Sequence, residues 1–361
     1  MSDGKTFLQP IEKKEDEERA LSRKMEEARA RKEDRYLDMI RKYLAMPKVT
    51  DIHITENKFL ALRLDGKIME TNIMVPERGI DRITNEIFHL QGWGRSNASG
   101  EYNGFRVRLR QSQSLQRKQL FIRVLPQRAP DIYKLGYGDI VQEELLAHGK
   151  ALNPGIVIVA GATGSGKSTL LASILQYILD KFPIHVVSAE DPVEYLLYDM
   201  QSEGGGIVSQ RELPDDCATF EEAVANAMRE DPDVILIGEM RTAPTAEATL
   251  QAAETGHLVF TTIHAANIPG IISRLLGLLK NTVDAEARLA QALRGCVYLS
   301  LKQNDKGEFE RRADFLWFDD ECRRLVREGK FYELRERVNS YLIKSYTGAK
   351  FTRASAPGEV A

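Results

Sequence analysis

The nine residues GATGSGKST at positions 161–169 constrain the fold of this chain more than any other feature. They match the pattern G-x-x-x-x-G-K-[ST], follow directly on the apolar run GIVIVA, and precede the apolar-periodic stretch TLLASILQYILDKF. A strand, a glycine-rich turn and a helix in this order form a P-loop, in which backbone N–H groups converge on a phosphate. A chance glycine loop is the weaker alternative in this context. We therefore expect an α/β nucleotide-binding domain.

The residues of this loop are expected to bind ATP in three ways. Gly161, Gly164 and Gly166 let the backbone curl so that several N–H groups and the positive end of the helix face the β-phosphate. Lys167 reaches the β- and γ-phosphates, and the hydroxyl of Ser168 suits Mg²⁺, which keeps most of its water ligands. The predicted nucleotide-binding residues of the loop are Gly161, Thr163, Gly164, Ser165, Gly166, Lys167, Ser168 and Thr169.

The stretch over residues 151–361 carries apolar, strand-like runs that alternate with helical segments. The runs IHVVSAE, DVILIGE and LVFTTIH follow the P-loop in turn. Continuous apolar runs bounded by turns fit parallel strands buried on both faces, so we expect a doubly wound sheet. Thr219 and Glu222 form a capping box that predicts a helix start, and Gly256 predicts a helix end. Beyond residue 284 we expect a mainly helical part.

The first third of the chain predicts a separate small domain. Residues 36–125 combine helical periodicity with alternating strand patterns and a turn at Asp65-Gly66, which is typical of an α+β domain. The segment 126–150 is expected to be a linker, because the stretch around it carries two prolines and two glycines in LPQRAPDIYKLGYGDI. Residues 1–35 predict a charged helical arm, either solvated or docked to a partner or a neighbouring subunit.

Composition argues against several classes of protein. The net charge of −3 over 361 residues gives no sign of a basic nucleic-acid binder. The three cysteines are scattered without a CxxC pair, which indicates a reducing compartment rather than a disulfide framework or a zinc site. The N-terminus lacks the apolar core of a signal peptide, and no apolar stretch is long enough for a membrane-spanning helix. We therefore expect no direct binding of nucleic acid, and a membrane role only through partner proteins.

Two acidic residues end strand-like runs of the predicted sheet. Glu239 follows DVILIG, and Glu190 ends the run VVSAE. Ligands of open α/β sheets bind at the carboxyl ends of the strands, so both carboxylates are expected beside the P-loop. One of these carboxylates can hold Mg²⁺ through water, and another can orient the attacking water. Asp191 and Glu194 are equally well explained as surface residues.

Two histidines stand at the ends of one apolar run in AETGHLVFTTIHA. His257 and His264 are seven positions apart, and an odd spacing on a strand points side chains to opposite faces. At roughly 3.3 Å per residue they lie more than about 20 Å apart and do not share a metal ion. His257 is expected to be structural. His264, at the carboxyl end of the strand, is expected to contact the γ-phosphate or the region of Glu239.

Four elements in order, GATGSGKST, AEDPVEY, REDPDVILIGEMR and AAETGHLVFTTIHA, closely resemble the secretion and pilus-retraction ATPases of the PilT/GspE superfamily. In that family they are the Walker A motif, the Asp box, the Walker B motif and the His box. The first domain carries a fainter likeness, since VTDIHITENKFLALRLDGKI is similar to the family's opening pattern. FRVRL and IRVLP are similar to its two arginine patterns.

The resemblance implies a RecA-like doubly wound P-loop domain preceded by a PAS-like α+β domain and a charged arm. Six copies would form a ring that hydrolyses ATP with Mg²⁺. Glu190 would polarise the attacking water, Glu239 would lie near Mg²⁺, and His264 would sense the γ-phosphate. Arg106 and Arg123 would match N-terminal-domain arginines that reach a nucleotide within or across subunits.

The chain departs from the family pattern at several points. Thr242 stands where G-E-M-R-D has its Asp, and LRGCVYLS at 293–300 lacks the Gln of the family's L-R-x-x-x-S-Q. The charged arm is unusual for a pilus-retraction motor. The stretch ADFLWFDDECRRLVREGKFYEL resembles the DotB-like ATPases of type IVB secretion and IncI-type conjugation more than the retraction motors.

These features together predict a hexameric ATPase motor for type IVB secretion or conjugative transfer of a protein or DNA–protein substrate. It would be cytoplasmic and peripheral at the inner face of the bacterial inner membrane, docked to membrane and cytoplasmic components of the apparatus. A type IV pilus retraction motor remains an alternative. A nucleotide-binding assembly or regulatory module without productive hydrolysis is a third possibility, from another class of protein.

Overall fold

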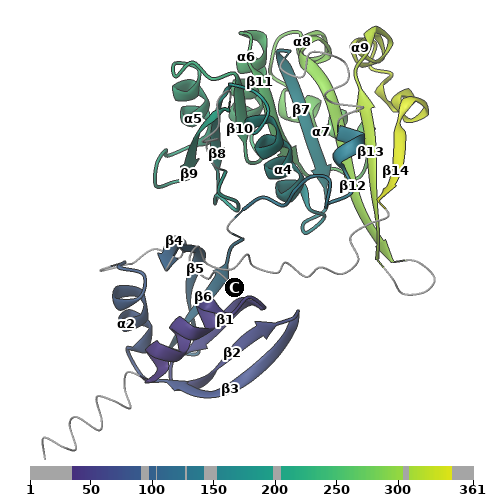
Figure 1. Ribbon diagram of the computed structural model, residues 1–361. Helices are drawn as coiled ribbons and strands as arrows, with labels where there is room; N and C mark the ends of the chain where they lie inside the picture. Colours follow the sequence, from purple (N-terminus) through teal and green to yellow (C-terminus); the bar gives the residue numbers. More distant parts are fainter. Residues whose placement is uncertain are drawn as a thin grey trace, which may run out of the picture. The chain divides into compact units, whose positions relative to one another are not determined.

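The chain divides into two compact units between Leu125 and Pro126, and each unit has its own sheet (Figure 1). The predicted arm over residues 1–35 lies outside the described residues, apart from its last position. The computed structural model describes residues 35–90, 97–102, 104–126, 128–141, 153–197, 205–303 and 309–343.

The first unit is a small α+β domain, as the sequence predicts. Its six-stranded antiparallel sheet has the order β3-β2-β1-β6-β5-β4. The predicted turn at Asp65-Gly66 joins β2 to β3, and both residues have positive φ angles, 51° and 77°. The strands are β1 (Val49–Thr55), β2 (Lys58–Leu64), β3 (Lys67–Val75), β4 (Asn97–Tyr102), β5 (Phe105–Ser114) and β6 (Arg117–Val124).

Alternate residues of this sheet form the core of the first unit. Ile52 and Ile54 of β1 are buried together with Leu120 and Ile122 of β6. A helix over residues 35–45 and α2 (Gly79–Glu86) supply the apolar side chains that join the same cluster. Alternation of this kind places one face of an antiparallel sheet in the core and leaves the other face polar.

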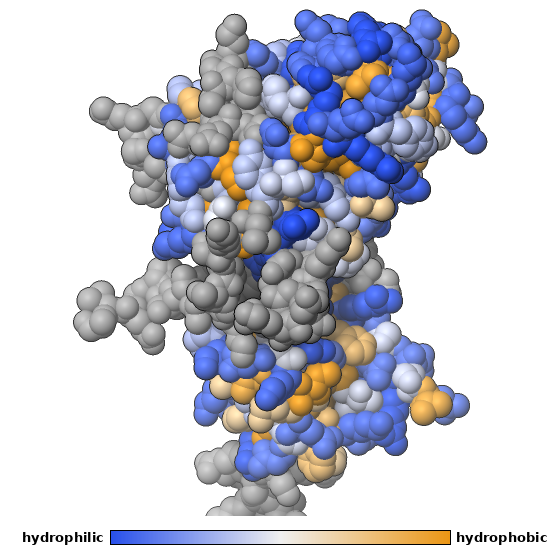
Figure 2. All heavy atoms as spheres, turned by 90° about the vertical axis from the view of Figure 1, so that its right-hand side faces the viewer, coloured by the Kyte–Doolittle hydropathy of each residue, from blue (hydrophilic) through white to orange (hydrophobic). Residues whose placement is uncertain are grey.

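Several large apolar side chains of the first unit are exposed. Phe59 of β2 and Ile68, Met69 and Met74 of β3 are each about half exposed or more. The face of the molecule that lies at the right of Figure 1 shows hydrophobic patches set among hydrophilic residues in this unit (Figure 2). Because β3 ends the sheet order, these side chains lie at or beside an edge of the sheet.

The second unit contains an eight-stranded sheet in the order β14-β13-β12-β7-β11-β10-β8-β9. The strands from β12 to β9 in this order run parallel, and β13 pairs antiparallel with both β12 and β14. The strands are β7 (Gly155–Gly161), β8 (His185–Glu190), β9 (Ile207–Glu212), β10 (Val234–Ile237), β11 (Leu258–Ile263), β12 (Leu293–Gln303), β13 (Phe309–Trp317) and β14 (Asn339–Ile343). The helices are α3 (Gly138–Val141), α4 (Lys167–Leu179), α5 (Phe220–Ala227), α6 (Ala243–Glu254), α7 (Ile268–Leu278), α8 (Ala285–Ala292), α9 (Asp320–Arg327) and the 3-10 helix η2 (Phe331–Arg337).

Both faces of this sheet are covered, which explains the continuous apolar runs. Ile156 and Ile158 of β7 belong to a core shared with α6, α7, α8 and α9. Val157 and Val159, which point to the other face, pack with α4. The sheet is therefore buried on both faces near its centre, as expected of a doubly wound α/β domain.

Part of the segment expected to be a linker packs onto the second unit. Ile132, Leu135, Tyr137 and Val141 are buried in the same cluster as α4. Burial of four apolar side chains ties residues 132–141 to the second unit, so only the chain before residue 132 joins this segment to the first unit. Residues 142–150 lie outside the described part.

The expectation of a mainly helical part beyond residue 284 is wrong. After α8 the chain forms β12, which pairs with the central strand β7, and then β13 and β14 at the edge of the sheet. The helices α9 and η2 lie between these last two strands in the sequence. The run CVYLSL is typical of a strand. It is flanked by charged residues and directly follows a helical pattern, so the strand is easily read as a continuation of the helix.

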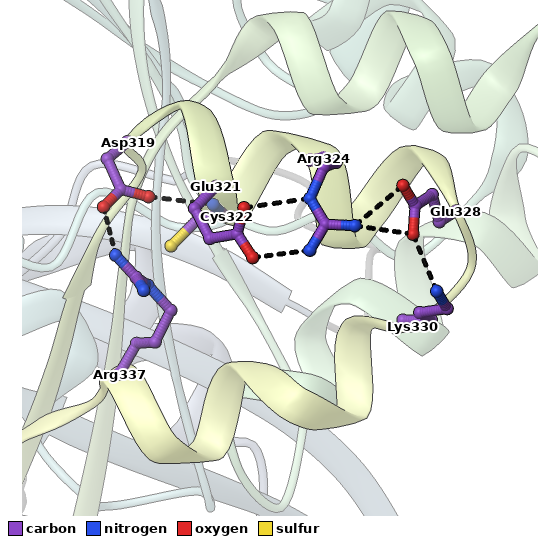
Figure 3. Close-up of polar contacts among 7 residues, drawn as sticks. All are labelled: Asp319, Glu321, Cys322, Arg324, Glu328, Lys330 and Arg337. Carbon is purple, nitrogen blue, oxygen red and sulfur yellow. Dashed lines mark hydrogen bonds and ion pairs between the residues drawn. The ribbon is translucent and has the colours of Figure 1, made fainter.

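Ion pairs link charged side chains along α9 and between η2 and the start of α9 (Figure 3). Arg324 lies between two carboxylates, 2.6 Å from that of Glu321 and 2.8 Å from that of Glu328. Arg337 of η2 pairs with Asp319, which also caps α9 by accepting a hydrogen bond from the backbone of Cys322. These exposed pairs order the helix ends and contribute little stability, since solvent screens exposed pairs. The buried side of α9, with Leu325 and Val326, joins the core.

Removal of Phe260 tests which interactions hold the second unit together. This side chain of β11 is fully buried at the middle of the sheet. Replacement by Ala should lower the free energy of unfolding by about 3–5 kcal/mol, because it leaves a cavity that the sheet cannot close. Phe59→Ala, at a half-exposed position of the first unit, is the control and should change it much less. Equal losses of unfolding free energy in the two variants, measured by urea denaturation, would contradict this description of the core.

Candidate functional site

The P-loop lies between the end of β7 and the start of α4. Gly161 has a φ of 151°, Gly164 of 80° and Gly166 of 97°, which favour glycine. A Cβ atom on Gly161 would lie 2.5 Å from both the carbonyl oxygen of Leu299 and the hydroxyl of Ser165. The first glycine is therefore required by close approach as well as by conformation, and the tight curl that the sequence predicts is present.

The cation of the loop is Lys167, the first residue of α4. Its Nζ donates hydrogen bonds to the carbonyl oxygens of Gly161 and Ala162, both at 3.1 Å. Burial lowers the pKa of this ammonium, and the carboxylates of Glu239 and Glu194 oppose that shift. Lys167 is thus held over the loop by two neutral carbonyl oxygens. Phosphate oxygens can take the place of these acceptors, because they form stronger, charge-assisted hydrogen bonds with the ammonium.

The remaining loop residues expected to bind ATP lie in the same turn. Thr163 is exposed, and Ser168 lies in the first turn of α4. The hydroxyl of Ser165 is buried and has no hydrogen-bond partner among the described residues. Thr169 contacts the hydroxyl of the buried Tyr195 at 2.8 Å. Thr169 thus links the loop to the segment that follows β8.

The carboxyl ends of four neighbouring strands meet beside this loop. Ala160 of β7 pairs with Ile263 of β11, and Thr261 of β11 pairs with Ile237 of β10. Ile237 in turn pairs with Ala189 of β8. The residues that follow these ladder positions are His264, Glu239 and Glu190, so the sheet brings the three predicted catalytic residues to one edge.

His264 connects the P-loop with the strand that carries Glu239. Its Nδ1 lies 3.2 Å from the carbonyl oxygen of Gly161, and its Nε2 lies 3.3 Å from Oε1 of Glu239. Both partners are acceptors, so each contact needs a proton on the nitrogen that faces it. The structure thus places His264 beside Glu239, and its contact with a γ-phosphate stays a prediction.

Arg241 was not assigned a role from the sequence. Its guanidinium lies 2.7 Å from Oε2 of Glu239, while His264 faces Oε1. This hydrogen bond raises the pKa of Arg241. The carboxylate of Glu239 is therefore held from both sides. Arg241 stands two residues after Glu239, and this short spacing is a sequence signal that could have identified it.

Glu190 accepts hydrogen bonds from two side chains that sequence reasoning also missed. Ser188 donates to Oε1 at 2.9 Å, and Gln210 of β9 donates to the same oxygen at 3.3 Å. Asp191 and Glu194, which the sequence left open, are exposed. Their charges nevertheless act on the site, Asp191 on Arg241 and Glu194 on Lys167.

His257, at the other end of β11, has a local role. Its Nδ1 lies 3.1 Å from the carbonyl oxygen of Ala252 and 3.3 Å from the hydroxyl of Thr255, at the end of α6. It thus caps a helix terminus, which fits the structural role expected of it. No cluster of three or more His, Cys, Asp or Glu residues arranged to hold a metal occurs in the described part of the chain.

The two arginines predicted to reach a nucleotide belong to the first unit. Arg123 of β6 donates to Asp51 of β1 at 2.8 Å, and Arg63 of β2 lies 3.7 Å from the same carboxylate. Arg106 is on the neighbouring strand β5. All are on the sheet face opposite the core residues, and the role of Arg106 and Arg123 toward a nucleotide stays a prediction.

Comparison with known proteins supports the same architecture. The family model described as type II/IV secretion system protein matches residues 97–343. The type IV pilus retraction ATPase PilT of Pseudomonas aeruginosa is 28% identical over 308 residues, which cover 82% of this chain and 87% of PilT. None of the helices that the structure describes is long and apolar enough to cross a bilayer.

Two solved structures share the fold of the chain. A pilus retraction motor PilT with bound ADP gives a TM-score of 0.71 at 32% identity and covers 83% of this chain and 88% of its own. The Legionella pneumophila ATPase DotB also gives 0.71, at 24% identity, over 84% of this chain and 88% of its own. Both likenesses support the RecA-like fold with an N-terminal domain.

Thr242, which replaces the Asp of the resembled motif, caps α6. Its hydroxyl accepts from the backbone N–H of Thr245 and contacts Oε1 of Glu221, at 3.2 Å. Although burial raises the pKa of Glu221, hydrogen bonds from Thr245, Thr219 and Thr242 bring it below its usual value. A carboxylate already occupies the space beside Thr242, which explains why a hydroxyl fits here.

Thr242→Asp should therefore destabilise the second unit. Asp is as good a helix cap as Thr, but it places a second negative charge beside Glu221. The free energy of unfolding should fall by about 1 kcal/mol, since the site is partly exposed. Thr242→Asn is the matched control, because it keeps the cap and the shape without the charge. Equal unfolding midpoints for the two variants would show that no repulsion exists.

Proposed function

Since this chain belongs to the family of type II/IV secretion system proteins, we propose that it is a hexameric ATPase motor for type IVB secretion or conjugative transfer across the bacterial envelope. It is a P-loop ATPase of the secretion and pilus type. The observation that carries the proposal is the set of contacts that joins the loop carbonyl of Gly161, His264 and Glu239 at the edge of the sheet. Such a bridge lets a bound nucleotide act on two strands at once.

ATP would bind with its phosphates in the P-loop and with Mg²⁺ beside them. Lys167 and the N–H groups at the start of α4 would hold the β- and γ-phosphates. The carboxylates of Glu190, Glu239, Asp191 and Glu194 outnumber the nearby cations, so a polyphosphate adds charge of the same sign. A divalent cation at the hydroxyl of Ser168 would offset this charge, and an oxygen donor set suits Mg²⁺.

Hydrolysis would use Glu190 and Glu239 for different purposes. Glu239, fixed between Arg241 and His264, would hold the water shell of the metal. Glu190 would orient the attacking water, because it ends the neighbouring strand β8 on the same edge. His264 would exchange its contact with the Gly161 carbonyl for one with the γ-phosphate, and would lose that contact when the phosphate leaves. Movement of the two units about the chain that joins them, before the packed segment 132–141, would transmit this change.

The type of machine that the motor serves is the finer part of the proposal. The C-terminal stretch over residues 313–334 and the charged arm favour a DotB-like role in secretion or conjugation. The motor would then be cytoplasmic, peripheral at the inner membrane, and docked to components of that apparatus. Pilus retraction is the second candidate, because the chain shares 32% identity with a retraction motor over most of its length. Genes for conjugation proteins or for pilins beside this gene would separate the two.

Lys167→Ala should lower ATP turnover roughly a hundredfold or more, because it removes the charge that faces the transferred phosphate. Lys181→Ala, just past the end of α4, is the control and should leave turnover unchanged. A coupled assay of the purified full-length chain measures both. Turnover at the wild-type rate in Lys167→Ala would overturn the P-loop mechanism. A wild type that binds ATP but never hydrolyses it as a ring with its partners would favour an assembly module instead.

His264→Ala should reduce turnover roughly tenfold or more while nucleotide binding persists, because the phosphates are held chiefly by the P-loop. His257→Ala removes the other histidine of the same strand and serves as the control. It should lower the unfolding temperature and leave turnover per folded molecule intact. The comparison requires steady-state rates and ADP affinities of both variants. Unchanged turnover in His264→Ala would remove the sensor role.

A further inference from the structure

The side chain of Gln210 faces the proposed water-orienting carboxylate from the neighbouring strand. Gln210 of β9 is the ladder partner of Ser188 of β8, and Glu190 lies two residues after Ser188 on the same face. Both Gln210 and Ser188 donate to Oε1 of Glu190, at 3.3 and 2.9 Å. Ser188 is fully buried, so this pair of donors lies on the inner side of the carboxylate.

The orientation of the Gln210 amide is determined by backbone groups. Its Oε1 accepts from the N–H of Leu197 at 2.7 Å, and its Nε2 donates to the carbonyl oxygen of Tyr195 at 3.0 Å. A backbone N–H only donates and a backbone carbonyl only accepts, so the amide cannot be turned over. The NH₂ group is therefore the part of Gln210 that faces Glu190.

The same segment reaches the P-loop. Tyr195 is buried, and its hydroxyl lies 2.8 Å from that of Thr169, the last residue of GATGSGKST. Hydrogen bonds thus run from the helix of the P-loop through Tyr195 to Gln210 and on to Glu190. Each step joins a different stretch of chain, so the position of the carboxylate depends on the loop that holds the phosphates.

We propose that Gln210 is a positioning residue for ATP hydrolysis, which holds Glu190 in place relative to the P-loop. This inference rests on the role proposed above for Glu190. Reacting groups need placement within a fraction of an ångström, and a displacement of about 1 Å can cost on the order of a hundredfold in rate. Gln210 itself touches neither nucleotide nor water in this role; it acts through the carboxylate.

Gln210→Met in the full-length protein tests the proposal. Met has a similar length without a polar group, and kcat should fall tenfold to a hundredfold, while KM for ATP and the affinity for ADP stay within about twofold. Gln176→Met is the matched control, since Gln176 donates to Asp180 at the end of α4 that lies away from the P-loop, and kcat should not change. Wild-type kcat in Gln210→Met would overturn the proposal.

A double substitution separates positioning from a general structural effect. In a Glu190→Gln background the carboxylate is already lost, so adding Gln210→Met should change the residual single-turnover rate less than about twofold. An equal loss in both backgrounds would show that Gln210 acts on the fold instead. If Gln210→Met does not fold, Gln210→Glu keeps the acceptor for Leu197 and lacks the NH₂, and it should show the same loss of kcat.

The experiment also separates this inference from the proposed function. Wild-type turnover in Glu190→Gln alone would remove the catalytic role of Glu190, and Gln210 would then have nothing to position. A strong loss in Glu190→Gln together with full activity in Gln210→Met would leave the proposed function intact and reject only the positioning role. A loss in both single variants, with no further loss in the double variant, supports the two together.

Discussion

The parallel register of four strands is the constraint on which the site depends. β7 pairs with β11, β11 with β10, and β10 with β8, and all four run in one direction. Their carboxyl ends therefore meet at one edge, and the residue that ends or follows each strand faces the same space. The P-loop follows β7, His264 follows β11, Glu239 follows β10, and Glu190 ends β8. A shift of one residue in any ladder would turn a functional side chain to the other face.

Burial on both faces explains why the sequence predicts this part of the fold well. GIVIVA, VVSA, VILI and LVFTTI are continuous apolar runs because α4 covers one face of the sheet and α6 and α7 cover the other. The edge beyond β12 was missed for the opposite reason. There the strands mix apolar with charged residues, as in RRADFLW, so neither a continuous apolar run nor a strict alternation indicates them, although β13 pairs with its sequence neighbour β12. The sequence likewise predicts a linker over residues 132–141, because their two glycines and the two prolines that precede them hide four apolar residues that pack with α4.

The candidate site divides into residues that a motif identifies and residues that only packing places. Lys167, Glu239 and His264 belong to short patterns whose chemistry needs those residue types, and the structure brings them together. Arg241 and Gln210 act on the glutamates from an adjacent loop and an adjacent strand. Their roles follow from the pairing of β8 with β9 and from the path of the chain after β10. The position of Arg241 two residues after Glu239 is visible in the sequence, whereas Gln210 has no required spacing from the glutamate that it holds.

The stretch that makes the chain resemble the DotB-like ATPases is explained chiefly by packing. Phe315 of β13, Phe318, Leu325, Phe331 and Leu334 are all buried in the cores of the second unit. Side chains buried within one unit touch no partner, so this likeness to the DotB-like ATPases lies first in how the edge of the sheet is covered. Recognition of a particular apparatus must instead come from exposed groups. On the described surface these include the charged outer side of α9 and the apolar side chains of β2 and β3, which the folding of either unit alone does not require.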